Sequence, residues 1–485
     1  MNGPIRRVTM GLLVCFVALL AGVSWYQVIR ADELRADPRN PRPLLSDRGK
    51  ERGLIVTADG VVVAESVEDP DDPRSFVRQY PEGEPFAHLV GYSSIVVGDS
   101  GLERSYATTL RSRRDLTISD LITVILGRDL RPRSLELTVN AALQKAAFEA
   151  LDGQTGAVVA LDPETGAILA LASSPSFEPG SLMDENAQTA WEALLADPDR
   201  PLVDRATREI YPPGSTFKTL VTGAAFDNET ATPETEFADP VEFSLPGSTA
   251  TISNASGRPC NDGISTTLLR AFVSSCNTIF ADLSIQVGAE EISATAHGAG
   301  FNRDFDFPWS IPQASFLVDE LVEDPAALAQ SGIGERDVRA TPLHMAMVAA
   351  SIANGGSTMT PYLVNRVFDA DGATTDSTTP EPLDLSMTPA SADVLTQMME
   401  RVVTEGTGRL AAVPGVRVAG KTGTSSGPGG LPNPWFIGFA PVEDPSIAIA
   451  VLIERGGFVG ESATGGGVAA PIASDLIAIW LASNQ

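Results

Sequence analysis

A serine and a lysine stand three residues apart directly after a Pro-Pro-Gly turn, in the segment Tyr-Pro-Pro-Gly-Ser-Thr-Phe-Lys that spans residues 211–218. The apolar residues that follow recur at helical spacing, so Ser215 is predicted to begin a helix and Lys218 to lie one turn above it. A serine hydroxyl becomes a good nucleophile when a base takes its proton, and a lysine can be that base if burial and a second cation lower its pKa. The backbone N–H groups at the start of a helix could also hold an oxyanion. The segment therefore predicts acyl transfer through a serine ester.

The simplest alternative is that Ser215 only caps a helix and that Lys218 is a solvated residue of its first turn. The composition argues against that interpretation, because only four of the 34 basic residues are lysines, at positions 50, 145, 218 and 421. Arginine keeps its proton near neutral pH, whereas lysine can lose it. Two of these four scarce lysines, Lys218 and Lys421, fall in short motifs, which indicates a chemical role for both.

Lys421 begins the motif Lys421-Thr422-Gly423-Thr424, in a segment whose alternating pattern predicts a strand. From the edge of that strand its ammonium could lower the pKa of Lys218 and attract a substrate carboxylate. The hydroxyls of Thr422 and Thr424 could bind the same carboxylate, and Gly423 would let a substrate backbone lie close to the strand.

A third motif, Ser-Cys-Asn at residues 275–277, lies between the two lysine motifs. Ser275 could pass a proton to the leaving group, while Asn277 could hold the substrate amide and Lys218. The backbone N–H groups of Ser215 and Thr424 are the expected oxyanion donors.

Taken in order, the three motifs resemble the S-x-x-K, S-D-N and K-T-G signature of the penicillin-binding proteins and serine β-lactamases. A cysteine replaces the central aspartate, so only Ser275 and Asn277 are carried over from the middle motif. The stretch Arg-Gly-Leu-Ile at 52–55 and the stretch from Gly332 to Met345 are similar to class B penicillin-binding proteins of the penicillin-binding protein A type. In the second stretch Ile333 and His344 stand where class B proteins have glutamine.

The resemblance implies an α+β fold, in which an antiparallel sheet is flanked by helices and preceded by a transmembrane helix and a small, mostly β N-terminal domain. The implied activity is that of a peptidoglycan D,D-transpeptidase. The D-Ala-D-Ala end of a stem peptide would acylate Ser215, D-Ala would leave, and an amine on a neighbouring strand would take the acyl group. β-Lactams such as penicillin would acylate the same serine. No metal or organic cofactor is implied, and the implied partner is a polytopic membrane glycosyltransferase of the SEDS type.

Two other functions share these motifs. A β-lactamase needs a base for fast deacylation, and no clear Glu-x-x-x-Asn loop stands between Asn277 and Lys421. A non-catalytic β-lactam sensor or scaffold would keep the fold without depending on Ser215. Both are alternatives to the transpeptidase.

An apolar stretch from about Met10 to Ile29 follows Arg6 and Arg7. Its length fits an uncleaved membrane anchor better than the shorter core of a signal peptide. Arginines also follow the stretch, so charge leaves its orientation open. Because the implied substrate lies outside the cell, we expect a single-pass protein of the cell membrane with an extracytoplasmic catalytic domain. The predicted segments are a cytoplasmic tail (1–8), the anchor (9–29), an N-terminal pedestal or docking domain (30–134) and a transpeptidase domain (135–485).

The net charge of −28 argues against binding to nucleic acid. Of the three cysteines, Cys15 lies in the apolar stretch, while Cys260 and Cys276 lie in the body. A disulfide between these two would stabilise the fold by about 3 kcal/mol at most and would pin the segment that carries Ser275 and Asn277. Two buried thiols are the alternative.

Overall fold

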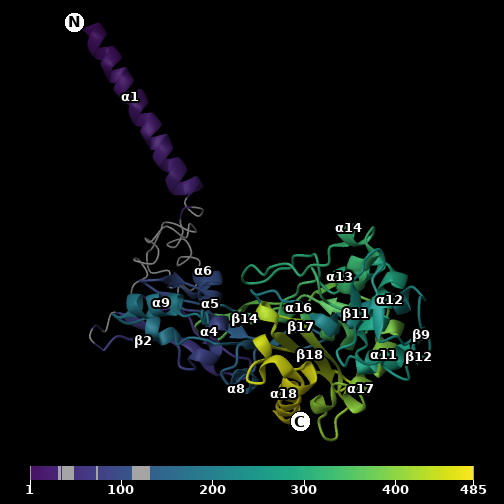
Figure 1. The fold of residues 1–485 in the computed structure, drawn as a ribbon. Helices are drawn as coiled ribbons and strands as arrows, with labels where there is room; N and C mark the ends of the chain where they lie inside the picture. Colours follow the sequence, from purple (N-terminus) through teal and green to yellow (C-terminus); the bar gives the residue numbers. More distant parts are fainter. Residues whose placement is uncertain are drawn as a thin grey trace.

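The computed structural model describes residues 2–30, 34, 49–70, 72, 75–111 and 131–483. Its body combines an antiparallel sheet that has helices on both faces with a smaller N-terminal part built mostly from strands. Figure 1 shows an N-terminal helix that stands apart from this body. The α+β fold predicted from the sequence is confirmed.

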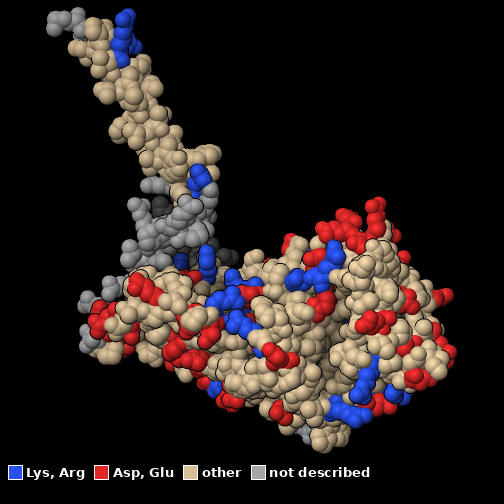
Figure 2. Space-filling model, viewed as in Figure 1, with Lys and Arg blue, Asp and Glu red and all other residues tan. Residues whose placement is uncertain are grey.

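The N-terminal helix α1 (Asn2–Ser24) continues as a π-helical turn, η1 (Trp25–Ile29). Its span Gly3–Ser24 has a mean hydropathy of 2.0, and none of it is buried against the described chain. Figure 2 shows basic side chains near the N-terminal end of this helix and uncharged side chains along the rest of its length. By length and composition this helix could cross a membrane. Because α1 begins at Asn2, residues 2–8 of the expected tail are helical as well.

The main sheet has the strand order β17-β18-β19-β7-β8, and all its neighbouring strands are antiparallel. Helix α16 covers one face, while α8 and α18 cover the other. Because both faces are buried, β7 and β19 read as continuous apolar runs rather than alternating ones. The strands are β7 (Gly156–Leu161), β8 (Ile168–Ser174), β17 (Ala419–Ser426), β18 (Pro432–Ala440) and β19 (Ile447–Ile453), and the helices are α8 (Ala141–Ala150), α16 (Pro342–Ala353) and α18 (Ala470–Ser483).

A second stretch, Gly465–Ser483, is also long and apolar enough to pass as a membrane span, with a mean hydropathy of 1.5. It consists of the π-helical turn η9 (Gly465–Ala469) and α18. Its residues Leu476 and Ile477 are buried against the sheet. We therefore interpret this stretch as a core helix of the body.

A helical region packs against the edge strand β17. Two small antiparallel pairs, β9 with β12 and β10 with β11, lie beside it. The strands β9 and β10 lie in the stretch from about 227 to 246. Strands of three residues are too short to give a periodic signal. The elements are α10 (Lys218–Asp227), α11 (Leu268–Ser274), α12 (Asn277–Val287), α13 (Ala289–Gly298), α14 (Val318–Leu321), α15 (Pro325–Gly332), α17 (Pro389–Thr404), β9 (Glu236–Ala238), β10 (Glu242–Ser244), β11 (Thr251–Ser253), β12 (Ser265–Thr267), β13 (Ser357–Met359) and β16 (Pro382–Leu385).

The N-terminal part shares a sheet with the larger part of the body. The strand order is β15-β14-β6-β1-β2-β3, so strands from both sides of residue 134 lie in one sheet. β1 pairs antiparallel with β2, so the chain near residues 52–64 forms a hairpin. The apolar core is continuous across the junction. The elements are β1 (Ile55–Val56), β2 (Val62–Glu68), β3 (Phe76–Gln79), β4 (Ser93–Ser94), β5 (Gly98–Asp99), β6 (Ser134–Leu137), β14 (Val364–Phe368), β15 (Thr374–Ser377), α4 (Ala87–Val90), α5 (Gly101–Ser105), α6 (Ala107–Leu110) and α9 (Ala187–Ala196).

A buried ion cluster holds the N-terminal part together around Glu103, whose side chain is fully buried. Its carboxylate accepts hydrogen bonds from Arg52 Nη2 and Arg78 Nε, each at 2.6 Å. Burial alone would raise the pKa of Glu103, but the charges of Arg78 and Arg52 lower it below its ordinary value. The stabilisation is therefore present above the pKa that Glu103 has in the unfolded chain, and it is lost as the pH falls below that value.

We expect Glu103→Ala to lower the free energy of unfolding by about 3 to 5 kcal/mol, because two arginines would stay buried without their counter-charge. Urea denaturation at neutral pH measures this loss. Glu68→Ala, which removes an exposed carboxylate from β2, serves as the control. A loss no larger than that of the control would contradict a stabilising role for the cluster.

Candidate active site

Ser215 lies in the tight turn η4 (Gly214–Phe217), which leads directly into α10. The preceding Gly214 has φ of +54°, a conformation that glycine adopts easily. Its N–H donates to Gly334 O at 2.9 Å, and a Cβ on Gly334 would lie 2.0 Å from Gly214 O. The glycine-rich stretch 332–334 therefore supports the serine turn by close backbone contact, without a side chain.

A buried polar group anchors the residues just before this turn. Trp435 Nε1 donates to Pro212 O at 3.1 Å, and the Tyr211 hydroxyl donates to Glu454 Oε1 at 2.7 Å. Arg205 Nε completes the group with a 2.9 Å hydrogen bond to the same carboxylate oxygen. The turn that carries Ser215 is thus tied to β18 and to the end of β19.

The Lys218 side chain is fully buried at the start of α10. Its Nζ donates to Ser275 O at 2.9 Å and to Asn277 Oδ1 at 2.8 Å. The Lys218 Nζ lies over the face of the Phe280 ring, 5.3 Å from its centroid. Burial, and then the charge of Lys421, hold the pKa of Lys218 well below its ordinary value.

Lys421 lies on the edge strand β17 and is also fully buried. Its Nζ donates to Ser275 Oγ and to Thr422 O, both at 2.9 Å. Burial lowers the pKa of Lys421 to about 7. The two lysines therefore contact the same residue, Ser275, one through its backbone oxygen and the other through its hydroxyl.

In the described chain, no hydrogen bond joins Lys218 Nζ to Ser215 Oγ. An unprotonated amine has two N–H groups and one lone pair. Here the two acceptors, Ser275 O and Asn277 Oδ1, can take both N–H groups, which leaves the lone pair for the serine proton. Catalytic pairs commonly close to hydrogen-bond distance only when substrate is bound.

Ser275 ends α11 in the left-handed conformation, with φ of 63° and ψ of 42°. This conformation costs a residue other than glycine about 1 to 2 kcal/mol. The next helix, α12, begins directly after it, and Asn254 Oδ1 accepts from the N–H groups of Asn277 (2.8 Å) and Thr278 (3.1 Å). Asn277 Nδ2 in turn donates to Ser253 O at 3.0 Å, which aims Asn277 Oδ1 at Lys218.

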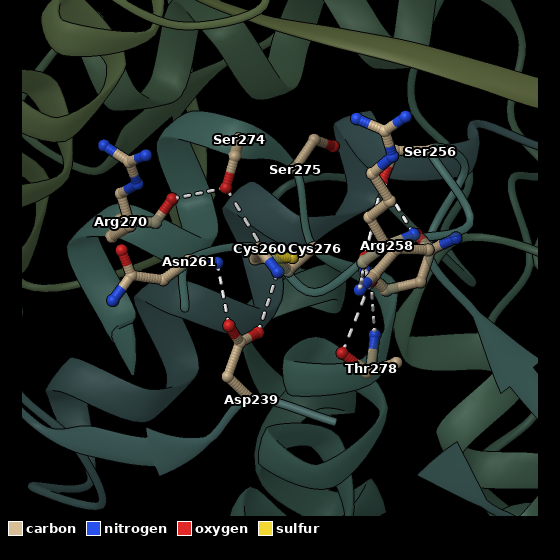
Figure 3. Close-up of a disulfide and its surroundings, with 12 residues drawn as sticks. Asp239, Ser256, Arg258, Cys260, Asn261, Arg270, Ser274, Ser275, Cys276 and Thr278 are labelled. Carbon is tan, nitrogen blue, oxygen red and sulfur yellow. Dashed lines mark hydrogen bonds between the residues drawn. A yellow bond between two sulfur atoms is a disulfide. The ribbon is translucent and has the colours of Figure 1, made fainter. Parts of the chain in front are cut away.

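A disulfide joins Cys260 to Cys276, the residue between Ser275 and Asn277. Figure 3 shows this bond at the start of α12, with the Asp239 carboxylate beneath it. Asp239 accepts from the N–H groups of Cys260 and Asn261, at 2.8 and 2.7 Å. Asp239 therefore holds in place the loop that contains Cys260.

The edge of β17 faces the serine turn. A Cβ on Gly423 would lie 2.9 Å from Pro213 O, so glycine is needed here for the packing of the turn as well as for any substrate. Thr424 pairs with Pro434, which has no N–H. The carbonyl of Thr424 points toward Gly214, because a Cβ added to Gly214 would lie 2.9 Å from Thr424 O. Because both backbone groups of a strand residue point to the same side, the Thr424 N–H is also directed to the open edge.

The structure thus brings the three motifs into one place. Ser215 and Lys218 come from η4 and α10, Ser275 and Asn277 from the turn between α11 and α12, and residues 421–424 from β17. Two further residues, Asn254 and Thr407, contact the motifs although neither belongs to a motif of the sequence, and Thr407 Oγ1 lies 2.6 Å from Thr422 Oγ1. No local sequence pattern marks either residue, because each contacts a motif that is distant in the sequence.

His344 is buried and packs against Phe305, and desolvation lowers its pKa to about 4.

Residues 156–478 match the penicillin binding protein transpeptidase domain, and residues 52–135 match the penicillin binding protein A dimerisation domain. This chain belongs to the penicillin-binding protein transpeptidase family. The first match alone spans more than half of the chain, and it includes Ser215, Ser275 and Lys421. A membership predicted from three short motifs is thereby confirmed.

Relatives of this penicillin-binding protein include the peptidoglycan D,D-transpeptidases PbpA of Mycolicibacterium smegmatis and of Mycobacterium tuberculosis. The first is 42% identical over 99% of both chains, and the second is 40% identical over 98% of both. The solved structure of penicillin-binding protein A from M. tuberculosis as a ceftriaxone acyl-enzyme complex is similar at a TM-score of 0.82. It is 37% identical and covers 90% of this chain and 99% of its own. The penicillin G acyl-enzyme complex of that protein has a TM-score of 0.81 and 38% identity, over 89% of this chain and 100% of its own.

We expect Cys260→Ser, which breaks the disulfide and leaves the motif residues in place, to slow acylation by a β-lactam. If Ser275 relaxes out of its left-handed conformation, the rate should fall by up to roughly 5- to 30-fold. The free energy of unfolding should fall by about 3 kcal/mol at most. Stopped-flow acylation measures the rate at a temperature where the variant is fully folded.

Reduction of the wild type should reproduce the effect of Cys260→Ser and should not alter that variant further. Cys15→Ser, which leaves both body cysteines unchanged, is the control. An unchanged acylation rate in the folded Cys260→Ser variant would show that the disulfide does not position the motif.

Proposed function

We propose that this chain is a peptidoglycan D,D-transpeptidase that works through an acyl-enzyme on Ser215. The observation that carries the proposal is the buried Lys218 amine, which has a lowered pKa and is held by Ser275 O and Asn277 Oδ1. Membership of the family supports it, as do relatives that carry the name D,D-transpeptidase and a similar protein whose acyl-enzyme complexes are solved.

In the proposed first step, Lys218 takes the proton of Ser215 and the serine oxygen attacks the penultimate D-Ala carbonyl. The tetrahedral oxyanion accepts hydrogen bonds from the N–H groups of Ser215 and Thr424, which are worth on the order of 3 kcal/mol each. The C–N bond then breaks, a proton passes to the leaving nitrogen through Ser275, and D-Ala departs. Lys421 Nζ is hydrogen-bonded to Ser275 Oγ, which supports this route.

In the second step, an amine from a neighbouring stem peptide attacks the Ser215 ester and gives up one proton to the site. The ester bond breaks, the serine regains a proton, and a new amide cross-link is formed. The carboxylate of the donor peptide would lie against Lys421 and the hydroxyls of Thr422 and Thr424, while Asn277 would hold the substrate amide. A β-lactam would acylate Ser215 in the same way.

We further propose that α1 anchors the protein in the cell membrane, with a single pass and an extracytoplasmic body. The length and hydropathy of α1 support an anchor, and the acyl donor is a component of the cell wall. A polytopic membrane glycosyltransferase of the SEDS type is the proposed partner. It would supply the new strands that this body cross-links, and the N-terminal part would be its docking domain.

A fluorescent penicillin should label the wild-type chain and should not label Ser215→Ala, because the ester cannot form without the hydroxyl. Gel fluorescence measures the labelling. Ser248→Ala, which changes an exposed serine beside β10, should label normally. Labelling that survives Ser215→Ala would refute the nucleophile, and rapid multiple turnover of nitrocefin would favour a β-lactamase instead.

Acylation should speed up with rising pH as Lys218 loses its proton, and this rise should occur well below pH 10.5, the ordinary lysine value. The direction follows because only the unprotonated amine can act as a base. Lys218→Arg should be as inactive as Lys218→Ala across this range, since arginine keeps its proton. Lys145→Arg, at a partly exposed position on α8, is the matched control. Retained acylation in Lys218→Arg would remove the base assignment.

A further inference from the structure

A short loop after α17 connects two of the three motifs. Its backbone contacts the end of α11, where Thr407 N–H donates to Val273 O at 3.3 Å, two residues before Ser275. Its side chain contacts β17, where Thr407 Oγ1 lies 2.6 Å from Thr422 Oγ1. A Cβ on Gly466 would lie 2.2 Å from Thr407 O, so η9 closes over the loop as well.

The hydroxyls of both threonines in the β17 motif lie within hydrogen-bond distance of other groups of the protein. Thr424 Oγ1 accepts from Gly465 N–H at 3.2 Å, which leaves its own proton to donate elsewhere. Thr422 is 5% exposed, and the hydroxyl of Thr407 lies within hydrogen-bond distance of its Oγ1. A hydroxyl has one proton to donate and two lone pairs that accept. If Thr407 donates to Thr422, then Thr422 also keeps its proton for another acceptor.

A carboxylate is an acceptor only, so a hydroxyl can bind it only by donating its proton. Thr422 and Thr424 lie two residues apart on one strand and therefore on one face of it. A site in which both hydroxyls are held as donors is suited to an anion and poorly suited to a neutral group. Thr407 Oγ1 and Thr422 Oγ1 are close enough to be hydrogen-bonded, and either hydroxyl can be the donor.

We propose that Thr407 is a positioning residue for the carboxylate of the acyl donor, acting through Thr422. It donates its proton to Thr422 Oγ1, and Thr422 then donates to the carboxylate of the stem peptide or of a β-lactam. This inference rests on the proposed function, because it concerns how the Ser215 site recognises its donor. It assigns a role to a residue outside the three motifs, on a loop that reaches them from α17.

The test compares two β-lactams on the same variants, benzylpenicillin and its neutral methyl ester. Thr407→Val keeps the shape of the side chain and removes the hydroxyl. It should lower the second-order acylation constant for benzylpenicillin by roughly 10- to 100-fold, as expected for the loss of a hydrogen bond to a charged group. With the ester, Thr407→Val should acylate at the wild-type rate for that ester. Thr407→Ser keeps a hydroxyl at this position, so its acylation constant for benzylpenicillin should be close to that of the wild type.

Equal slowing with acid and ester would indicate that the loop is merely structural and would overturn the proposal, as would no slowing with either. Thr404→Val, an exposed threonine at the end of α17, is the matched control. In a double-mutant cycle, Thr407→Val should add little to Thr422→Val, because one acts through the other. Full additivity would mean that Thr407 binds the carboxylate by itself and would overturn the positioning role.

The outcome is separable from the test of the proposed function. Labelling that depends on Ser215 but is insensitive to Thr407→Val with either β-lactam overturns only the present inference. Labelling that survives Ser215→Ala overturns the proposed function itself.

Discussion

The site depends on the removal of one amine from water. Lys218 is buried beside a second buried lysine, and its two hydrogen-bond acceptors are a backbone oxygen and an amide oxygen, neither of them charged. A carboxylate at either position would favour the ammonium form and leave the amine unable to accept a proton. Burial and the nearby charge of Lys421 both lower the pKa of Lys218. The other features of the site can be understood as means of keeping this arrangement in place.

Three separate structural features hold the residues around Lys218 in place. The serine turn is fixed by close backbone contacts to Gly334 and to the edge of β17, which only glycines permit at those positions. The turn between α11 and α12 holds Ser275 in an unfavourable conformation by means of Asn254 and a disulfide. The strand β17 is the edge of a sheet that has buried apolar clusters on both faces, so its own position is determined by the core. A site assembled from such different elements requires each of them to be rigid.

The N-terminal part is coupled to this scaffold through a shared sheet and a continuous apolar core. Its own stability depends on the buried pairing of Glu103 with Arg52 and Arg78, which come from three separate segments of the sequence. Cutting the chain near residue 134 would remove β1, β2 and β3 from the sheet to which β14 and β15 belong. The two parts therefore form one packed body, although each matches a family of its own.

The sequence by itself determined the chemistry and the class of fold. Ser215 and Lys218 are related by a single helical turn, and the scarcity of lysine marked Lys218 and Lys421, so local spacing and composition were sufficient for them. Only the tertiary structure decided that both lysines meet at Ser275, that Asn277 presents its oxygen to Lys218, and that Asn254 and Thr407 complete the site. Cys260 and Cys276 could be named from the sequence, but their bond could not, because pairing depends on how the loop folds back. These contacts join residues that are 15 to 146 positions apart in the sequence. No local pattern encodes such contacts, since they arise from the packing of the sheet and helices that bring the segments together.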